Sequence, residues 1–215
     1  MPSTPLFTPR RRRLLVAAAG AALVAAPALG VRAQTPAPPR RLTPAQTEGP
    51  FYPLTLPADS DADLLRNGGL RYAKGQPAWV EGSVTDLAGR PVRGAVVEIW
   101  QCDEQGHYHH PGDGDRADRA FQGFGKTVVD GEGRYRFRTI RPVAYGGRAP
   151  HIHVKVKLDR RDLLTTQLYA QGDAANARDF LWQRLRNDED RAALTVAFVP
   201  GSDGLLAQFA LVVAA

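Results

Sequence analysis

Length, composition and charge set the first limits on this chain. It has 215 residues, of which 43% are hydrophobic and 23% are charged, so it is long enough to bury a core and too apolar to be disordered throughout. The formal charge is +6, but five of the 28 basic residues lie before residue 34, and without them 23 basic residues face 22 acidic ones. That balance excludes the basic footprint of a nucleic-acid-binding domain. The single cysteine, Cys102, excludes an intramolecular disulfide and a multi-cysteine zinc site.

Residues 1–33 are typical of an export signal. A basic run, Arg10–Arg13, precedes an apolar stretch over residues 14–29, and Val31–Ala33 ends in the small residue of a cleavage site. Paired arginines followed by two leucines fit a twin-arginine signal, and the plain secretory route is the alternative. We therefore expect an exported bacterial protein, periplasmic or extracellular.

The apolar stretch does not predict a lasting membrane anchor. It contains Gly20 and Pro27 and is rich in alanine, whereas a spanning helix needs ~20 strongly apolar residues. We expect cleavage after residue 33 and no stable membrane insertion afterwards. Residues 34–46, which are rich in proline, are then expected to form an extended tether, and residues 47–215 to form the folded domain.

The rest of the chain alternates strand patterns with turns. Residues 78–85 alternate along the chain and lead into the turn Asp86–Gly89, which predicts a hairpin to the following strand. A second turn, Asp130–Gly133, precedes the strictly alternating residues 134–140 and predicts another hairpin. The other predicted strands are residues 95–100, 124–129, 151–158, 165–170, 195–199 and 206–213.

Short strands punctuated by glycine and proline turns predict an all-β fold. Only residues 174–186 have a helical pattern. We expect a β-sandwich of the transthyretin or immunoglobulin type, with long active-site loops and one short C-terminal helix.

The sequence His151-Ile-His153 is the strongest chemical signal. In a strand, residues two apart point to the same face, so both imidazoles can converge on one metal ion. An exposed or structural pair is the alternative for so short a motif. Tyr145 and Arg148 precede the pair in a loop rich in proline and glycine, and such loops collect binding groups on a rigid scaffold.

Tyr108 is the second chemical signal. It follows a buried-looking strand, in a polar segment around Gly106. A tyrosine phenolate is a hard anionic donor suited to ferric iron, and with a pKa of ~10 it ionises at neutral pH only beside a cation. The histidines on either side, His107, His109 and His110, are expected to be solvated rather than to bind metal.

Several motifs, in order along the chain, resemble the intradiol ring-cleavage dioxygenases, the non-haem ferric family that includes protocatechuate 3,4-dioxygenases and catechol 1,2-dioxygenases. The matching segments are Thr47–Pro53, Gly82–Asp86, Gly94–Gln101, Gly106–His109, Phe121–Gly125, Tyr135–Ile140, Arg148–His153 and Thr166–Tyr169. They span most of the chain that follows the tether.

The resemblance implies a ferric site. Tyr108, Tyr145, His151 and His153 match the family's Fe(III) ligands. Tyr145 also matches the tyrosinate that can accept a substrate proton, Arg148 matches the active-site arginine that stabilises anionic charge, and Gln167 matches the glutamine lining the pocket. The implied reaction cleaves a catechol-type ring between its two hydroxylated carbons with O2, giving a cis,cis-muconate-type diacid. The implied partners are a small aromatic diol, O2 and a second copy of the chain in a homo-oligomer.

The sequence also departs from the family's pattern. No segment between Gln34 and Gly75 is long enough for the helical dimerisation segment of catechol 1,2-dioxygenases, and Gly146-Gly147 joins Tyr145 almost directly to Arg148 where protocatechuate enzymes have a longer loop. These features resemble an exported branch of the family.

Two other classes of protein compete with this interpretation. One is a non-catalytic exported β-sandwich binding module. The other is a cupin-like ferrous oxygenase, which needs a carboxylate near its histidines, and none lies between residues 145 and 158.

Four further side chains receive structural predictions. Tyr135 and Tyr169 alternate within strands and are expected to be structural, and Cys102 is expected to be a small packing residue or part of the pocket wall. Tyr52, in the first matching motif, is a candidate to approach the site.

Overall fold

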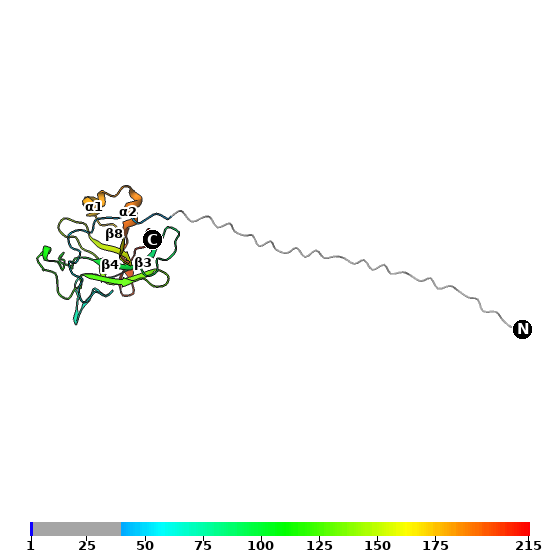
Figure 1. The fold of residues 1–215 in the computed structure, drawn as a ribbon, viewed down its shortest axis with the longest axis horizontal. Helices are drawn as coiled ribbons and strands as arrows, with labels where there is room; N and C mark the ends of the chain where they lie inside the picture. Colours follow the sequence, from blue (N-terminus) through cyan, green and yellow to red (C-terminus); the bar gives the residue numbers. More distant parts are fainter. Residues whose placement is uncertain (2–39) are drawn as a thin grey trace. The chain divides into compact units, whose positions relative to one another are not determined.

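The computed structural model describes Met1 and residues 40–215. The export signal and residues 34–39 of the predicted tether lie outside the described residues. Residues 40–215 contain two five-stranded sheets and a small two-stranded ribbon, drawn in Figure 1. The prediction of an all-β sandwich is confirmed.

The first sheet is built around β3 (Pro77–Thr85). β6 (Arg134–Ile140) pairs with it antiparallel, and β11 (Gly204–Gln208) and β12 (Leu211–Val212) pair with it in parallel. β10 (Val199–Gly201) extends the sheet beyond β11.

The second sheet has the order β5-β4-β7-β8-β9. Its strands are β5 (Phe124–Val128), β4 (Val96–Trp100), β7 (His151–Leu158), β8 (Arg161–Ala170) and β9 (Thr195–Val196). The central strands are antiparallel, and only β9 joins in parallel.

The remaining elements are short. The ribbon consists of β1 (Arg66–Asn67) and β2 (Leu70–Arg71), and the 3-10 turns are η1 (Pro111–Asp113) and η2 (Asn176–Arg178). The helices α1 (Phe180–Gln183) and α2 (Asp188–Leu194) lie together at one edge of the domain (Figure 1). The helix predicted over 174–186 is therefore reduced to α1, and α2 was not predicted.

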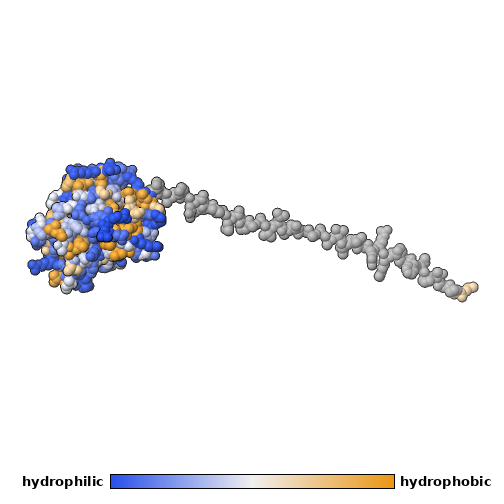
Figure 2. All heavy atoms as spheres, in the orientation of Figure 1, coloured by the Kyte–Doolittle hydropathy of each residue, from blue (hydrophilic) through white to orange (hydrophobic). Residues whose placement is uncertain are grey.

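The core fills the space between the two sheets. Alternate residues of each strand point inward, so Val80 and Phe137 from the first sheet meet Ile99, Ile152 and Leu168 from the second, all fully buried. The face shown in Figure 2 mixes hydrophilic residues with smaller apolar areas. Within residues 40–215 no helix has the length and apolar character needed to cross a bilayer.

Both predicted hairpins are wrong, although both turns form. The Gly89 amide donates to the Asp86 carbonyl at 2.9 Å, and the Gly133 amide donates to the Asp130 carbonyl at 2.9 Å. The strands on the two sides of each turn nevertheless belong to different sheets. Turn residues reverse the chain, but the burial of apolar faces decides which strand becomes the partner.

The folded domain begins before residue 47. The Thr43 amide donates to the Val212 carbonyl at 2.9 Å, and the Gln46 amide donates to the Thr165 carbonyl at 2.9 Å. Residues 43–53, called the N-terminal strap below, therefore lie against the domain, so the last residues of the predicted tether belong to it.

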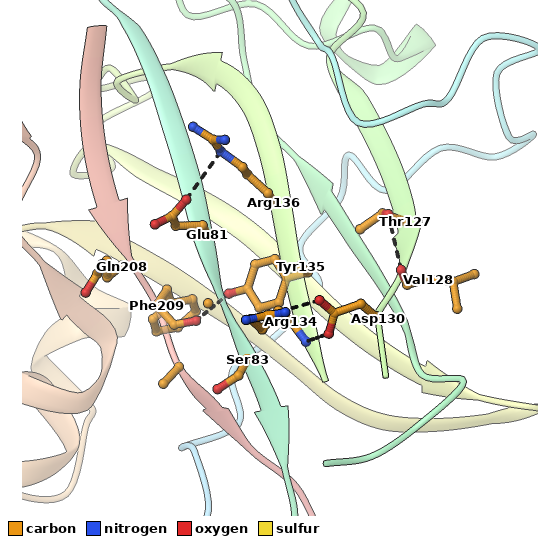
Figure 3. Close-up of a pocket in the computed structure, with 12 residues that line it drawn as sticks. Glu81, Ser83, Thr127, Val128, Asp130, Arg134, Tyr135, Arg136, Gln208 and Phe209 are labelled. Carbon is orange, nitrogen blue, oxygen red and sulfur yellow. Dashed lines mark hydrogen bonds and ion pairs between the residues drawn. The ribbon is translucent and has the colours of Figure 1, made fainter. Parts of the chain in front are cut away.

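Gly82 lies where the last strands approach β3 most closely. A Cβ at this position would meet the Phe209 carbonyl oxygen at 2.0 Å. The same carbonyl accepts a hydrogen bond from the Tyr135 hydroxyl (Figure 3), which confirms that Tyr135 is structural. Backbone fills the space that a side chain would need.

Replacing Gly82 with alanine should therefore destabilise the domain, because the Phe209 backbone must move and Tyr135 then loses its acceptor. We expect the free energy of unfolding in urea to fall by about 2 kcal/mol or more. Gly131→Ala is the matched control, since no atom lies within 4 Å of its Cβ position. Equal stability of the two variants would contradict this account of the packing.

Candidate metal centre

The two histidines lie at the start of β7, on the face of the second sheet that points away from the core. Both side chains are 1% exposed, and their Nε2 atoms are 3.2 Å apart. Nδ1 of His151 lies 2.6 Å from the Ala149 carbonyl. A carbonyl oxygen only accepts, so Nδ1 carries the proton and Nε2 of His151 presents its lone pair.

Burial keeps both imidazoles neutral. Desolvation and the nearby charge of Arg148 lower the pKa of His151 to about 4. Desolvation, His151 and Arg148 lower the pKa of His153 well below its usual value. Neutral imidazoles are the form that binds a metal ion.

The two tyrosines complete a cluster of four rings. The Tyr108 ring lies 4.9 Å from that of Tyr145 and 6.2 Å from that of His153, and the Tyr145 ring lies 5.4 Å from that of His151. Tyr108 is 2% exposed, and within residues 40–215 its hydroxyl has no hydrogen-bond partner. The structure therefore brings together all four side chains predicted as ligands.

Burial alone would keep both phenols protonated. Desolvation raises the pKa of Tyr108 well above its ordinary value. Burial also raises the pKa of Tyr145, while the positive charge of Arg148 opposes that shift. A cation placed among these rings would reverse this preference by stabilising the phenolates.

The arrangement fits a metal ion. Two ligand nitrogens ~2.1 Å from one ion and at right angles to each other are about 3 Å apart, close to the observed 3.2 Å. A buried hydroxyl without a partner is costly unless something binds it. In the part of the chain that the structure describes, no group of three or more His, Cys, Asp or Glu side chains could hold a metal, so the oxygen donors beside this pair are the tyrosines. The carboxylate that a cupin-like site needs is not among them.

Further aromatic rings stack against two members of the four-ring cluster and fix their orientation. Trp100 stacks on His153, with ring centroids 4.7 Å apart and planes 9° apart, and Phe51 stacks on Tyr108 at 4.8 Å. Gly49 of the strap, with φ +75°, leaves room for the His153 ring, because a Cβ there would lie 3.3 Å from Cε1. The strap therefore forms one wall of the site.

Tyr52 does not contact the four-ring cluster that it was expected to approach, but packs behind Trp100. Its hydroxyl donates to Glu98 Oε2 at 2.8 Å, and its ring packs edge-on against Trp100 at 5.0 Å. Tyr52 thus supports Trp100 rather than approaching the four-ring cluster. Cys102 is buried beside the Val143 carbonyl, as expected for a packing residue.

Arg148 and Gln167 meet beside the cluster. Arg148 Nη2 donates to Gln167 Oε1 at 2.7 Å, and Gln167 Nε2 donates to the Thr47 carbonyl at 3.1 Å. Gln167 pairs directly with His153 across β7 and β8, which places it on the same face of the sheet. The structure thus brings together the two residues that were expected to line the pocket.

Sequence reasoning missed two residues here. Tyr169 was predicted to be structural, but it pairs with His151 across the strands and its hydroxyl lies 3.3 Å from Arg148 Nη2. Asp179 was not considered, yet it binds Arg148 Nε at 2.7 Å. Tyr169 could have been found by aligning the two strands, and Asp179 by its position before a helix.

The loop histidines organise the chain between β4 and β5. His109 Nε2 lies 2.5 Å from the Phe121 carbonyl, and His110 Nδ1 accepts from the Gly112 amide at 2.9 Å. His110 is buried, so the expectation that it is solvated was wrong. Its Nδ1 holds a turn instead.

A groove also lies on the domain surface away from the four-ring cluster. Its volume is about 880 Å³, and its lining, including Glu81, Arg134, Arg136 and Gln208 (Figure 3), contains no residue of the four-ring cluster. Glu81 and Arg136 form an ion pair across it, as do Asp130 and Arg134. Its size alone therefore does not make it the functional site.

The fold is an all-β sandwich with two histidines on the outer face of its second sheet and two tyrosines beside them on the covering loops. A family model described as dioxygenase matches residues 47–192. The chain belongs to the intradiol ring-cleavage dioxygenase family.

Relatives with curated names are also intradiol dioxygenases. The chain is 39% identical to the protocatechuate 3,4-dioxygenase beta chain of Burkholderia cepacia over 57% of each chain. It is 34% identical to the hydroxyquinol 1,2-dioxygenase of Corynebacterium glutamicum over 61% of this chain and 47% of that one. The match thus spans about half the length of these relatives.

A solved structure matches more completely. The dioxygenase domain of a dioxygenase carbohydrate-binding protein fusion from the cellulolytic bacterium Streptomyces sp. SirexAA-E is 31% identical, with a TM-score of 0.64. The match covers 80% of this chain and 97% of that domain.

The depressed pKa of the histidine pair predicts acid sensitivity of the metal-free protein. Between pH 6.5 and about pH 4 the unfolded chain binds a proton at His151 that the folded chain does not, so the free energy of unfolding should fall as the pH falls. We expect a loss of about 2 kcal/mol from His151 alone between pH 7 and pH 5, measured by urea unfolding. The His151→Asn variant should lose less over the same range. A wild-type protein equally stable at both pH values would contradict the neutral, buried pair.

Proposed function

We propose that the chain is a non-haem Fe(III)-dependent intradiol dioxygenase. It cleaves a catechol-type ring between its two hydroxylated carbons with O2, giving a cis,cis-muconate-type diacid. Family membership supports the reaction type. The observation that carries the proposal is the convergence of the two Nε2 atoms of His151 and His153 beside the buried, unpartnered hydroxyl of Tyr108.

Four residues would hold the iron. His151 and His153 supply neutral nitrogens, and Tyr108 and Tyr145 supply phenolate oxygens, which ferric iron prefers. Bound Fe(III) acts as a Lewis acid and template that makes a chelated diol reactive toward O2. Two phenolates would balance much of the ferric charge in a site with little water.

The two tyrosines have different surroundings and therefore different roles. Tyr108 is buried beneath Phe51, whereas Tyr145 is half-buried on a loop whose next two residues are Gly146 and Gly147. Tyr145 can therefore move as substrate enters and accept a hydroxyl proton from the diol at Oη. Arg148, next to it, favours the phenolate before that transfer.

Arg148 and Gln167 would orient the substrate. The guanidinium carries a permanent positive charge and stabilises negative charge that develops on the diol as it reacts. Gln167 is held by the strap carbonyl of Thr47 and in turn accepts from Arg148. Phe51 stacks on Tyr108 and Trp100 stacks on His153, so both rings would help to keep water from these two ligands.

We also infer export to the periplasm or beyond. The basic and apolar pattern of residues 1–33 supports export. Cell fractionation tests this inference, and a protein retained in the cytoplasm with residues 1–33 uncleaved would contradict it.

Two substitutions separate iron binding from turnover. Tyr108→Phe removes a buried anionic ligand and should lose most of the iron, whereas Arg148→Ala should keep the iron and lose about 10²-fold or more in kcat. Iron content is measured by metal analysis, and the diacid product by mass spectrometry with ¹⁸O2. Tyr135→Phe is the matched control, because that buried tyrosine lies on the first sheet and should change neither quantity.

Full iron and activity in a variant with both Tyr108 and Tyr145 changed to phenylalanine would contradict the proposal. A wild-type protein that binds the diol, leaves it intact and takes up no iron would favour the binding module instead.

A further inference from the structure

We propose that Asp179 is a positioning residue, which holds the guanidinium of Arg148 in one orientation so that a single edge of it faces the substrate. The inference rests on the proposed function. It is carried by the contacts of one fully buried carboxylate, which lies 31 residues from its partner in the chain.

Asp179 sits immediately before α1 and is 0% exposed. Its Oδ1 accepts from the amides of Leu181 and Trp182, both at 3.0 Å. Its Oδ2 accepts from Arg148 Nε at 2.7 Å and from the Ala149 amide at 2.9 Å. Oδ1 thus caps the helix and also accepts from Arg148 Nη2 at 3.4 Å, whereas Oδ2 binds Arg148 Nε and the Ala149 amide.

Capping does not explain this choice of residue. Asparagine and serine cap a helix as well as aspartate does, through one side-chain oxygen. The second oxygen and the negative charge of Asp179 are not needed for α1, and both are directed at Arg148. A buried arginine without a counter-charge would be strongly destabilising, and the amide donors keep the carboxylate ionised.

These contacts leave one edge of the guanidinium available. Nε binds Asp179 Oδ2, and Nη2 binds Gln167 Oε1 at 2.7 Å, with Tyr169 Oη at 3.3 Å and Asp179 Oδ1 at 3.4 Å. None of these contacts involves Nη1. Because the guanidinium is planar, fixing Nε and Nη2 also fixes the direction of Nη1.

The same carboxylate reaches the histidine pair through one peptide. The amide of Ala149 donates to Asp179, and the carbonyl of Ala149 accepts from His151 Nδ1 at 2.6 Å. Asp179 therefore orders the segment that sets the tautomer of His151. Arg148 depends on it directly and His151 only through the backbone, so loss of the charge should affect turnover more than iron binding.

The experiment compares Asp179→Asn and Asp179→Ser in the iron-loaded, full mature chain, because both variants keep a capping oxygen. We expect iron content close to that of wild type at a temperature where both variants are folded, a lower melting temperature because the buried arginine loses its counter-charge, and a fall in kcat of about 10²-fold. Asp203→Asn is the matched control, since it breaks an Arg–Asp pair of 3.0 Å with Arg138 on the first sheet and should leave kcat unchanged.

Two readouts separate positioning from a general structural role. In a double-mutant cycle, adding Asp179→Asn to Arg148→Ala should lower kcat no further, because the two residues act as one unit. In the metal-free protein, the ¹⁵N-labelled Arg148 Nε–H should give a slowly exchanging NMR signal that both Asp179 variants lose.

The outcomes that would overturn the proposal are distinct. Additive effects in the cycle, or near wild-type kcat in a variant that has lost the NMR signal, would show that Arg148 does not need Asp179. Unfolding with iron loss in both variants would make its role structural. A wild-type protein without iron or turnover would overturn the proposed function and this inference together. The wild-type protein is therefore assayed before any variant, so that this outcome is distinguished from a failure of the inference alone.

Discussion

The site depends on the burial of two imidazole nitrogens that face each other. His151 and His153 lie on the polar side of β7, which in an ordinary sandwich would meet water. Here the strap, the loop that carries Tyr108 and the loop that carries Tyr145 cover that side, so the Nε2 atoms are 3.2 Å apart with both side chains 1% exposed. Such an arrangement is unfavourable unless a proton or a cation lies between the nitrogens. The proposed metal ion would occupy this position and would account for the closure of the polar face of the sheet.

The surrounding contacts preserve this arrangement. Flat stacking on Trp100 fixes the ring of His153, and the Ala149 carbonyl fixes the tautomer of His151. Ligand geometry in metal sites depends on such outer contacts as much as on the ligands themselves. The buried pair of Arg148 and Asp179 adds a permanent positive charge next to the site without leaving a net buried charge. The strands of the sandwich thus hold the two histidines and Gln167 in a rigid frame, and the covering loops add the two tyrosines and Arg148.

Much of this could be predicted from local pattern. Strand β6 was predicted to the residue, and the two-residue period placed both histidines on one face. The partners of the strands were not predictable, because turn residues such as Asp86 and Asp130 specify a reversal and not the sheet that receives the next strand. Asp179 was missed for a similar reason: its role appears only when two segments 31 residues apart meet. The residues that carry the chemistry could be predicted from local sequence patterns, whereas the contacts between distant segments became known only from the structure.

One measurement tests the central claim most directly: the visible absorption spectrum of the purified mature protein, taken with metal analysis, before and after addition of anaerobic catechol. Phenolate bound to ferric iron absorbs in the visible range, and chelation by a catechol should shift that band. The account predicts a coloured protein with about one iron per chain, because one cluster supplies the four donors, and a band that moves when catechol is added. A colourless protein that takes up no iron after reconstitution with ferric or ferrous salt would contradict it.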